Sequence, residues 1–149
     1  MILHEQHIDL NMRETSKDGI LRHLTGLLCQ DGTVTDGEKF LKDVYYRETL
    51  GETGIGSGIA IPHGKSDAVR QTSMAVGIND QGVAWESLDE MPIRCVVLFA
   101  VREDDKSAMV RMLSQVAVKF CDEDVVKQIF QCTDKQEVMR LLDVQLPVM

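Results

Sequence analysis

The chain contains 149 residues, of which 44% are hydrophobic and 27% charged, and its 24 acidic and 16 basic side chains give a formal charge of -8. These values are typical of a globular protein rather than a disordered polyelectrolyte or a fibrous repeat, and we expect a single domain over residues 1–149. An acidic chain lacks the basic surface that non-specific nucleic-acid binding requires, so we expect no nucleic-acid partner.

The hydropathy pattern predicts no membrane insertion. The longest apolar run, Cys95 to Val101, has seven residues, whereas a membrane-spanning helix needs about twenty. Residues 1–11 lack the basic flank and the apolar stretch of a signal peptide. We therefore expect a cytoplasmic protein, and we interpret its cysteines, which form no C-x-x-C pair, as reduced core residues: Cys29, Cys95, Cys121 and Cys132.

Apolar periodicity predicts two helices in the N-terminal third of the chain. Ser16 can cap the first, which ends at the turn pair Asp31-Gly32 and has an apolar face made of Ile20, Leu21, Leu24, Leu27 and Leu28. Thr35 and Glu38 form a capping box ahead of the second helix, which runs to about Leu50.

Strand patterns follow these helices. Residues 59–61 form a short apolar strand, and Met74, Val76 and Ile78 alternate with small or polar residues, as in a second strand. A turn at residues 80–82 leads into residues 83–85, where we predict a hairpin. Pro92 precedes an unbroken apolar run, residues 93–101, which predicts a central strand covered on both faces.

Three more helices are predicted after that strand. The first begins near Ser107 and presents Val110, Leu113, Val116, Ala117 and Phe120. Asp122 caps the second, over residues 125–130, and Thr133 with Gln136 forms a capping box before the third, over residues 138–142. Helices, strands and then helices predict an α/β or mixed sandwich.

The segment from Gly51 to Gly64 carries the clearest chemical signal and reads GETGIGSGIAIPHG. Its glycines let backbone amides approach an anion such as phosphate. Neither the Walker A pattern nor G-x-G-x-x-G fits, because Ile59 occupies a glycine position of both. Pro62 ends the short strand and presents His63 in a fixed direction, although a histidine in an ordinary surface turn is the alternative.

This segment resembles the active-site signature of the enzyme IIA domains of the bacterial sugar phosphotransferase system, fructose/mannitol type. That signature contains T-G-I-G-x-G-I-A-I-P-H-G, present here from Thr53 to Gly64, and an R-E pair, present here as Arg47-Glu48, sixteen residues before the histidine. The resemblance extends over nearly the whole chain. It implies an α/β single-domain sandwich with a central mixed β-sheet of about five strands flanked by helices.

The resemblance also implies an activity. His63 would accept a phosphoryl group from the histidine-containing phosphocarrier protein and pass it to a IIB domain during sugar uptake, without a metal or organic cofactor. Neutral imidazole can act as the nucleophile, and Arg47 would stabilise the phosphoryl group, although an exposed arginine that pairs with a neighbouring glutamate is the alternative. The loop at the phosphoryl site would comprise Thr53, Gly54, Gly56, Ser57, Gly58 and Gly64.

One position departs from the family pattern. Many members carry a second site histidine in an H-L-x-x-L-S motif, and counting back from Leu113-Ser114 places Met109 there. Methionine cannot carry a proton or donate a hydrogen bond. The resemblance also includes nitrogen-type relatives, so a regulatory IIA-type module, whose phosphorylation state controls binding to other proteins, is the alternative function, and the missing histidine fits either. The sequence leaves the sugar and the oligomeric state open.

The remaining histidines give weaker signals. His4 and His7 have H-x-x-H spacing in a segment that we expect to be frayed, without acidic or cysteine partners at ligand spacing. A zinc protein that uses these two histidines and a cysteine is a third reading. We expect His23 on the surface of the first helix.

Overall fold

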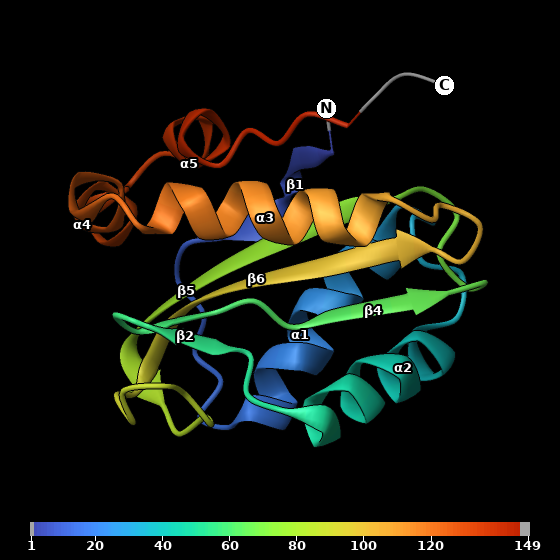
Figure 1. The fold of residues 1–149 in the computed structure, drawn as a ribbon, viewed down its shortest axis with the longest axis horizontal. Coiled ribbons are helices and arrows are strands. Elements are labelled where there is room, and N and C mark those ends of the chain that lie inside the picture. The colour runs from blue at the N-terminus through green and yellow to red at the C-terminus, as the bar shows by residue number, and fades with distance from the viewer. Residues whose placement is uncertain (1, 147–149) are drawn as a thin grey trace.

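The computed structural model describes residues 2–146, which form five helices and one mixed sheet. Figure 1 shows the helices packed around the sheet. Along the chain the elements are β1 (Leu3–Asp9), α1 (Lys17–Gln30), α2 (Gly37–Leu50), β2 (Gly54–Gly56), β3 (Ile59–Ala60), β4 (His63–Ser66), β5 (Ser73–Val83), β6 (Ile93–Arg102), α3 (Ala108–Phe120), α4 (Glu123–Gln131) and α5 (Lys135–Leu141). The predicted α/β sandwich with a mixed sheet is confirmed.

Strand β6 is the centre of the sheet. The strand order is β1-β5-β6-β3-β2, and β4 also pairs with β6. Strand β5 is antiparallel to β6, whereas β3 and β4 are parallel to it, with Ile59 opposite Cys95 and His63 opposite Phe99. Strands β3 and β4 therefore lie end to end along one side of β6, and Pro62 stands between them.

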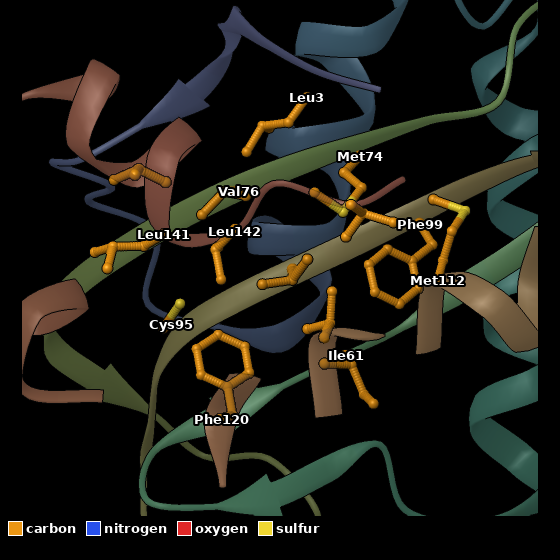
Figure 2. Packing of buried hydrophobic residues seen from close by; sticks show 14 of the residues in the cluster. Leu3, Ile61, Met74, Val76, Cys95, Phe99, Met112, Phe120, Leu141 and Leu142 are labelled. Atoms are coloured by element: carbon orange, nitrogen blue, oxygen red, sulfur yellow. The ribbon is translucent and has the colours of Figure 1, made fainter. Parts of the chain in front are cut away.

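Both faces of the sheet are covered by helices, α1 and α2 on one and α3, α4 and α5 on the other (Figure 1). Alternate residues of β6 belong to the two hydrophobic clusters: Cys95, Val97, Phe99 and Val101 to the first, and Val96, Leu98 and Ala100 to the second. Figure 2 shows the first cluster, in which Phe99 and Met112 lie together. The prediction that residues 93–101 form a central strand is confirmed.

The helix caps agree with prediction in two of four cases. The Ser16 hydroxyl accepts the Gly19 amide, and Asp122 caps α4. The predicted capping boxes at Thr35 and Thr133 are wrong, because the next residue, Asp36 or Asp134, is the cap in each case. Aspartate is a somewhat better cap than threonine, and the Thr35 hydroxyl instead donates to the Ala68 carbonyl.

Two strand predictions need correction. The predicted hairpin between residues 74–78 and 83–85 is absent, because β5 continues to Val83 with an irregular register after Ile78, and its antiparallel partner is β6. The segment expected to be frayed forms β1, which pairs in parallel with β5. There His7 is fully buried, and its Nε2 lies 2.9 Å from Asp31 Oδ2.

The predicted apolar face of α3 is also partly wrong. The core takes Ala108, Met112, Val116 and Phe120 from this helix, whereas Val110 is 70% exposed. Cys121 is exposed as well, so the four cysteines are free but not all in the core. Within residues 2–146, no helix combines the length and the hydropathy needed to cross a membrane.

Candidate functional site

The site is centred on His63, the first residue of β4, which is 8% exposed. Its Nδ1 lies 3.1 Å from the carbonyl oxygen of Ile61. A carbonyl only accepts hydrogen bonds, so Nδ1 carries the proton and Nε2 retains a free lone pair. Burial lowers the pKa of His63; the bond to Ile61 and the nearby Glu48 oppose this effect, whereas Arg47 adds to it. The imidazole is therefore neutral and nucleophilic at pH 7.

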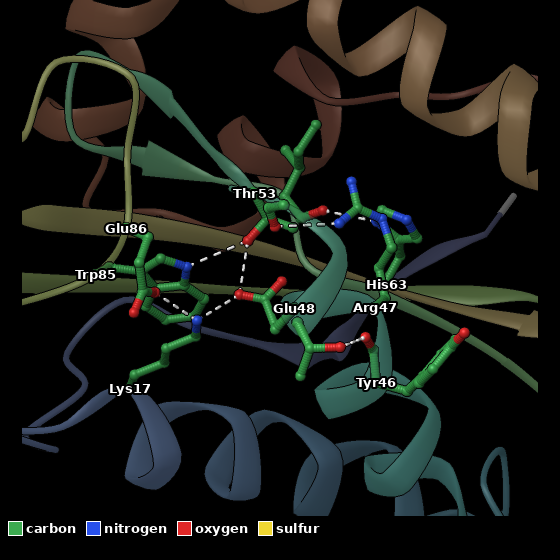
Figure 3. A network of polar contacts seen from close by, with 11 residues as sticks. Lys17, Tyr46, Arg47, Glu48, Thr53, His63, Trp85 and Glu86 are labelled. Carbon is green, nitrogen blue, oxygen red and sulfur yellow. Dashed lines mark hydrogen bonds and ion pairs between the residues drawn. The ribbon is translucent and has the colours of Figure 1, made fainter.

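Gly64 brings α2 against this strand. A Cβ atom at Gly64 would lie 2.8 Å from Val44 Cγ2 and 3.0 Å from Phe40 Cε1, so only glycine fits under the helix without displacing it. Arg47 follows Val44 by about one helical turn. The close approach of α2 to β4 thus carries Arg47 to the edge of His63, as Figure 3 shows.

A cavity of about 400 Å³ adjoins His63. One wall comes from the end of α2, the loop after it and the histidine strand, and the other from α3. The lining residues are Arg47, Glu52, Thr53, Ile55, Ile61, His63, Val110, Leu113, Ser114 and Ala117. The polar and charged groups gather on the histidine side, and α3 contributes mainly apolar surface.

The structure places Arg47 and Thr53 at this cavity together with His63. One Arg47 nitrogen, Nη1, donates to the Gly51 carbonyl at 3.2 Å, which leaves its other donors available to an anion. The alternative, a surface arginine paired with a neighbouring glutamate, does not occur, because no ion pair of Arg47 is present among residues 2–146.

The glycine turn lies farther away than the sequence suggested. Gly56, Ser57 and Gly58 have positive φ angles of 97°, 58° and 79° at the β2–β3 turn, and Asp89 Oδ2 accepts the Ser57 amide at 2.9 Å. Ile59, next to this turn, is opposite Cys95 on β6, whereas His63 is opposite Phe99, four residues farther along that strand. At the usual rise of a strand, the two positions are about 13 Å apart. The amides of this turn do not line the cavity.

Gly54 serves packing. A Cβ atom at this position would lie 2.5 Å from Ser87 Cβ and 2.6 Å from the Glu86 carbonyl oxygen, so the glycine permits the β5–β6 loop to lie against β2. Of the predicted phosphoryl loop, only Thr53 lines the cavity, and Gly64 acts through the packing of α2.

Met109 does not line the cavity. It is half-buried and packs against the first hydrophobic cluster, whereas its neighbour Val110 faces the space beside His63. Sequence reasoning missed Val110 as a site residue, because the spacing of α3 suggested a core position. Val110 is recognised as a site residue by its exposure at the cavity, which is visible only in the structure.

The other histidines lie elsewhere. The rings of His4 and His7 meet edge to face, 5.8 Å between centroids, and His23 bonds Asp9 at 2.7 Å and is partly exposed. In the described part of the chain, no group of three or more histidine, cysteine or acidic side chains could hold a metal ion.

Known proteins are similar to this chain in both sequence and fold. The family model described as "Phosphoenolpyruvate-dependent sugar phosphotransferase system, EIIA 2" matches residues 1–144. The PTS system fructose-like EIIA component of Escherichia coli is 30% identical, and the alignment covers 91% of each chain. The 2-O-alpha-mannosyl-D-glycerate-specific EIIABC component of the same organism is 31% identical over 95% of this chain, which spans 22% of that relative.

Two solved structures are similar throughout. The nitrogen regulatory protein IIA-Ntr from Neisseria meningitidis superposes with a TM-score of 0.87 at 28% identity, covering 95% of this chain and 96% of that one. A chain from the complex of enzyme IIA-mannitol with phosphorylated enzyme IIB-mannitol from Escherichia coli gives a TM-score of 0.75 at 25% identity. The match covers 92% of the present chain and 94% of the chain from the complex.

Proposed function

Because this chain belongs to the EIIA 2 family of the phosphoenolpyruvate-dependent sugar phosphotransferase system, we propose that it accepts a phosphoryl group on His63 and passes it to a IIB domain during sugar uptake. The observation that carries this proposal is the hydrogen bond from Nδ1 of His63 to the Ile61 carbonyl, which leaves Nε2 of this cavity-lining histidine unprotonated. No cofactor takes part in the proposed reaction, since imidazole is itself the nucleophile.

In the proposed reaction, Nε2 of His63 attacks the phosphorus atom carried by the phosphocarrier. The phosphorus–nitrogen bond on the carrier breaks as a new one forms on Nε2, and the imidazole gains positive charge. The proton stays on Nδ1, where the Ile61 carbonyl stabilises it. Arg47 supplies charge-assisted hydrogen bonds to the phosphoryl oxygens, and onward transfer breaks the bond to Nε2 as a IIB cysteine takes the group.

The surface around the cavity suits protein partners. Val110 is 70% exposed, and Leu113, Ala117 and Ile55 extend this apolar patch along the cavity. A mostly apolar patch next to a few charged groups is typical of the centre of a protein interface. We infer that the phosphocarrier and the IIB domain dock here in turn, which agrees with the known complex of a similar IIA protein with phosphorylated IIB.

The test is phosphorylation of the purified chain by phosphoenolpyruvate, enzyme I and the phosphocarrier, followed by mass spectrometry under non-acidic conditions. We expect one phosphoryl group, located on His63. His63→Ala abolishes uptake, whereas the matched control His23→Ala, which changes a partly exposed histidine on α1, retains it. Undiminished phosphorylation of His63→Ala overturns the proposal.

A regulatory function is the second candidate. It is favoured by the TM-score of 0.87 with a nitrogen regulatory IIA protein, against 0.75 for the mannitol protein. The two candidates differ in what the phosphorylated chain does next. Loss of the phosphoryl group to a IIB cysteine supports transport, and binding to a protein outside the phosphotransferase system that depends on the phosphate supports regulation.

A further inference from the structure

A polar network adjoins the site and joins four segments of the chain; it is buried at Glu48, Thr53 and Trp85 and open to solvent at Glu86 (Figure 3). Oε1 of Glu48 accepts hydrogen bonds from Lys17 Nζ at 2.6 Å and from the Thr53 hydroxyl at 2.9 Å. The Thr53 hydroxyl in turn accepts the Trp85 indole N–H at 3.2 Å, and Lys17 Nζ also pairs with Glu86 at 2.7 Å and lies 5.0 Å from the centre of the Trp85 ring.

A carboxylate in this place is costly. The side chain of Glu48 is only 7% exposed, and its second oxygen, Oε2, is buried without a hydrogen-bond partner. Burial of a charge destabilises a protein unless a counter-ion and hydrogen bonds offset it. Lys17 is that counter-ion: although burial opposes its charge, its bonds to Glu48 and Glu86 raise its pKa. A network of this cost at the edge of a reactive histidine suggests a role in the reaction.

The network reaches His63 through the Ile61 peptide, by one backbone–backbone hydrogen bond and one bond from the imidazole to a backbone carbonyl. The Thr53 carbonyl accepts the Ile61 amide at 2.9 Å, and the Ile61 carbonyl accepts Nδ1–H of His63 at 3.1 Å. The Thr53 hydroxyl has one proton, which it gives to Glu48, so this hydroxyl cannot also donate to a phosphoryl group. The threonine is thus a fixed link between Glu48 and the peptide that holds the imidazole.

We propose that Glu48, held by Lys17, is a positioning residue: it fixes Thr53, and through Ile61 it keeps the proton of His63 on Nδ1 and Nε2 directed at the phosphoryl donor. This inference rests on the proposed function of His63 but concerns the unphosphorylated protein. The charge of Glu48 has a second effect, because it raises the pKa of His63 against the lowering by burial and by Arg47. Glu52 is the other titratable group at the cavity.

Nitrogen-15 NMR of the imidazole tests the proposal directly, because the two tautomers have different ring-nitrogen shifts. We expect the Nδ1–H tautomer in the wild type and in Thr53→Ser, which keeps the hydroxyl. Thr53→Val and Glu48→Ala shift the tautomer ratio about fivefold toward Nε2–H, as the weakening of one hydrogen bond predicts. We expect phosphoryl uptake to be slower in Thr53→Val and Glu48→Ala as well, and to be unchanged in Thr53→Ser.

Two further variants separate charge from position. Glu48→Gln keeps an acceptor for Thr53 but removes the negative charge, so the titration midpoint of His63 moves to lower pH while the Nδ1–H tautomer persists. Glu86→Gln is the matched control, since it removes the exposed partner of Lys17 and leaves Glu48 in place; we expect neither change.

An unaltered tautomer ratio in folded Thr53→Val, or a lower melting temperature without any change in tautomer or titration, overturns the positioning role. Because these measurements need no phosphoryl donor, they stand apart from the test of the proposed function. A failure of phosphorylation on His63 contradicts the function, and a failure of the tautomer to respond contradicts only the role of Glu48.

Discussion

At the scale of the residue, the site combines one nucleophile with one cation. The proton on Nδ1 of His63 is held by the backbone carbonyl of Ile61, so other side chains can influence the tautomer only through this peptide. Arg47 is the only basic residue that lines the cavity in the described part of the chain. In the proposed transfer, the positive charge beside the phosphoryl group would therefore come from this one guanidinium.

Arg47→Ala should slow phosphoryl uptake about ten- to a hundredfold, because one charge-assisted hydrogen bond contributes roughly 1.5–3 kcal/mol. Arg47→Lys should recover only part of the rate, since an ammonium lacks the planar set of donors that fits phosphate oxygens. Rapid-quench measurement of uptake checks this. Uptake by Arg47→Ala at the wild-type rate would mean that the arginine does not contact the phosphoryl group.

At the scale of the element, the packing of α2 on β4 determines where Arg47 lies. Gly64→Ala places a methyl group 2.8 Å from Val44 Cγ2 and 3.3 Å from the Val44 backbone nitrogen, so the helix must move. We expect a loss of about 1–3 kcal/mol in the free energy of unfolding, as in other overpacked cores, together with slower uptake.

The matched control for this change is Gly26→Ala in α1, where an added Cβ has nothing within 4 Å. We expect it to stabilise the protein by about 0.5–1 kcal/mol and to leave uptake unchanged. Urea unfolding of both variants gives the comparison. Equal stability of Gly64→Ala and the wild type would contradict the close contact between α2 and β4.

The rotational setting of α3 gives a second prediction at this scale. Val110 faces the cavity, whereas Met109 packs against the first hydrophobic cluster. Val110→His should therefore place an imidazole beside His63 and change the lifetime of phosphohistidine by up to about tenfold, the equivalent of 1.4 kcal/mol. Met109→His should mainly lower the melting temperature, because it buries a polar ring.

Phosphohistidine hydrolysis and thermal melts of both variants distinguish the two positions. A larger kinetic effect from Met109→His, without destabilisation, would show that the family motif aligns as the sequence suggested and that α3 is rotated relative to the present structure.

The elements that could be predicted are those with an unambiguous local pattern. Helix α1 has a regular apolar face and a serine cap, and β6 has an unbroken apolar run, so both were found. Strand β1 was missed because its burial does not alternate: the adjacent His7 and Ile8 are both buried, and its pairing with β5 is irregular. An irregular strand of this kind has no period-2 signal.

The site could be predicted as far as its residues lie in one segment. His63 and Arg47 were identified from a motif within residues 47–64. Lys17 and Trp85 were not, because their contacts with Glu48 and Thr53 join distant parts of the chain and depend on the assembled fold. The sequence also placed the glycine turn at the phosphoryl group, which the structure does not support. The turn is close to His63 in sequence, but the extended chain between them carries it away along β6.

At the scale of the whole molecule, one strand belongs to both hydrophobic clusters. Because β6 contributes alternate residues to the cluster under α1 and α2 and to the cluster under α3 to α5, neither cluster can lose its order alone. We therefore predict a single cooperative domain over the chain, with one unfolding transition.

Trp85, the only tryptophan, lies beside α1 and the site and reports on one side of the sheet, whereas far-ultraviolet circular dichroism reports on all helices. The two unfolding curves in urea should coincide. If the fluorescence transition came at a clearly lower urea concentration than the loss of helix, the chain would contain two cooperative units.

The pairing of β1 has a consequence for synthesis on the ribosome. Leu3 is opposite Met74, which lies 71 residues later in the chain. Strand β1 therefore has no strand partner until the ribosome has made the residues up to β5. At about 5–20 residues per second this interval is roughly 4–14 s. During it, His7 and Ile8 remain exposed to water or to chaperones, and the nascent chain can complete its sheet only after the segment that presents His63 has already emerged.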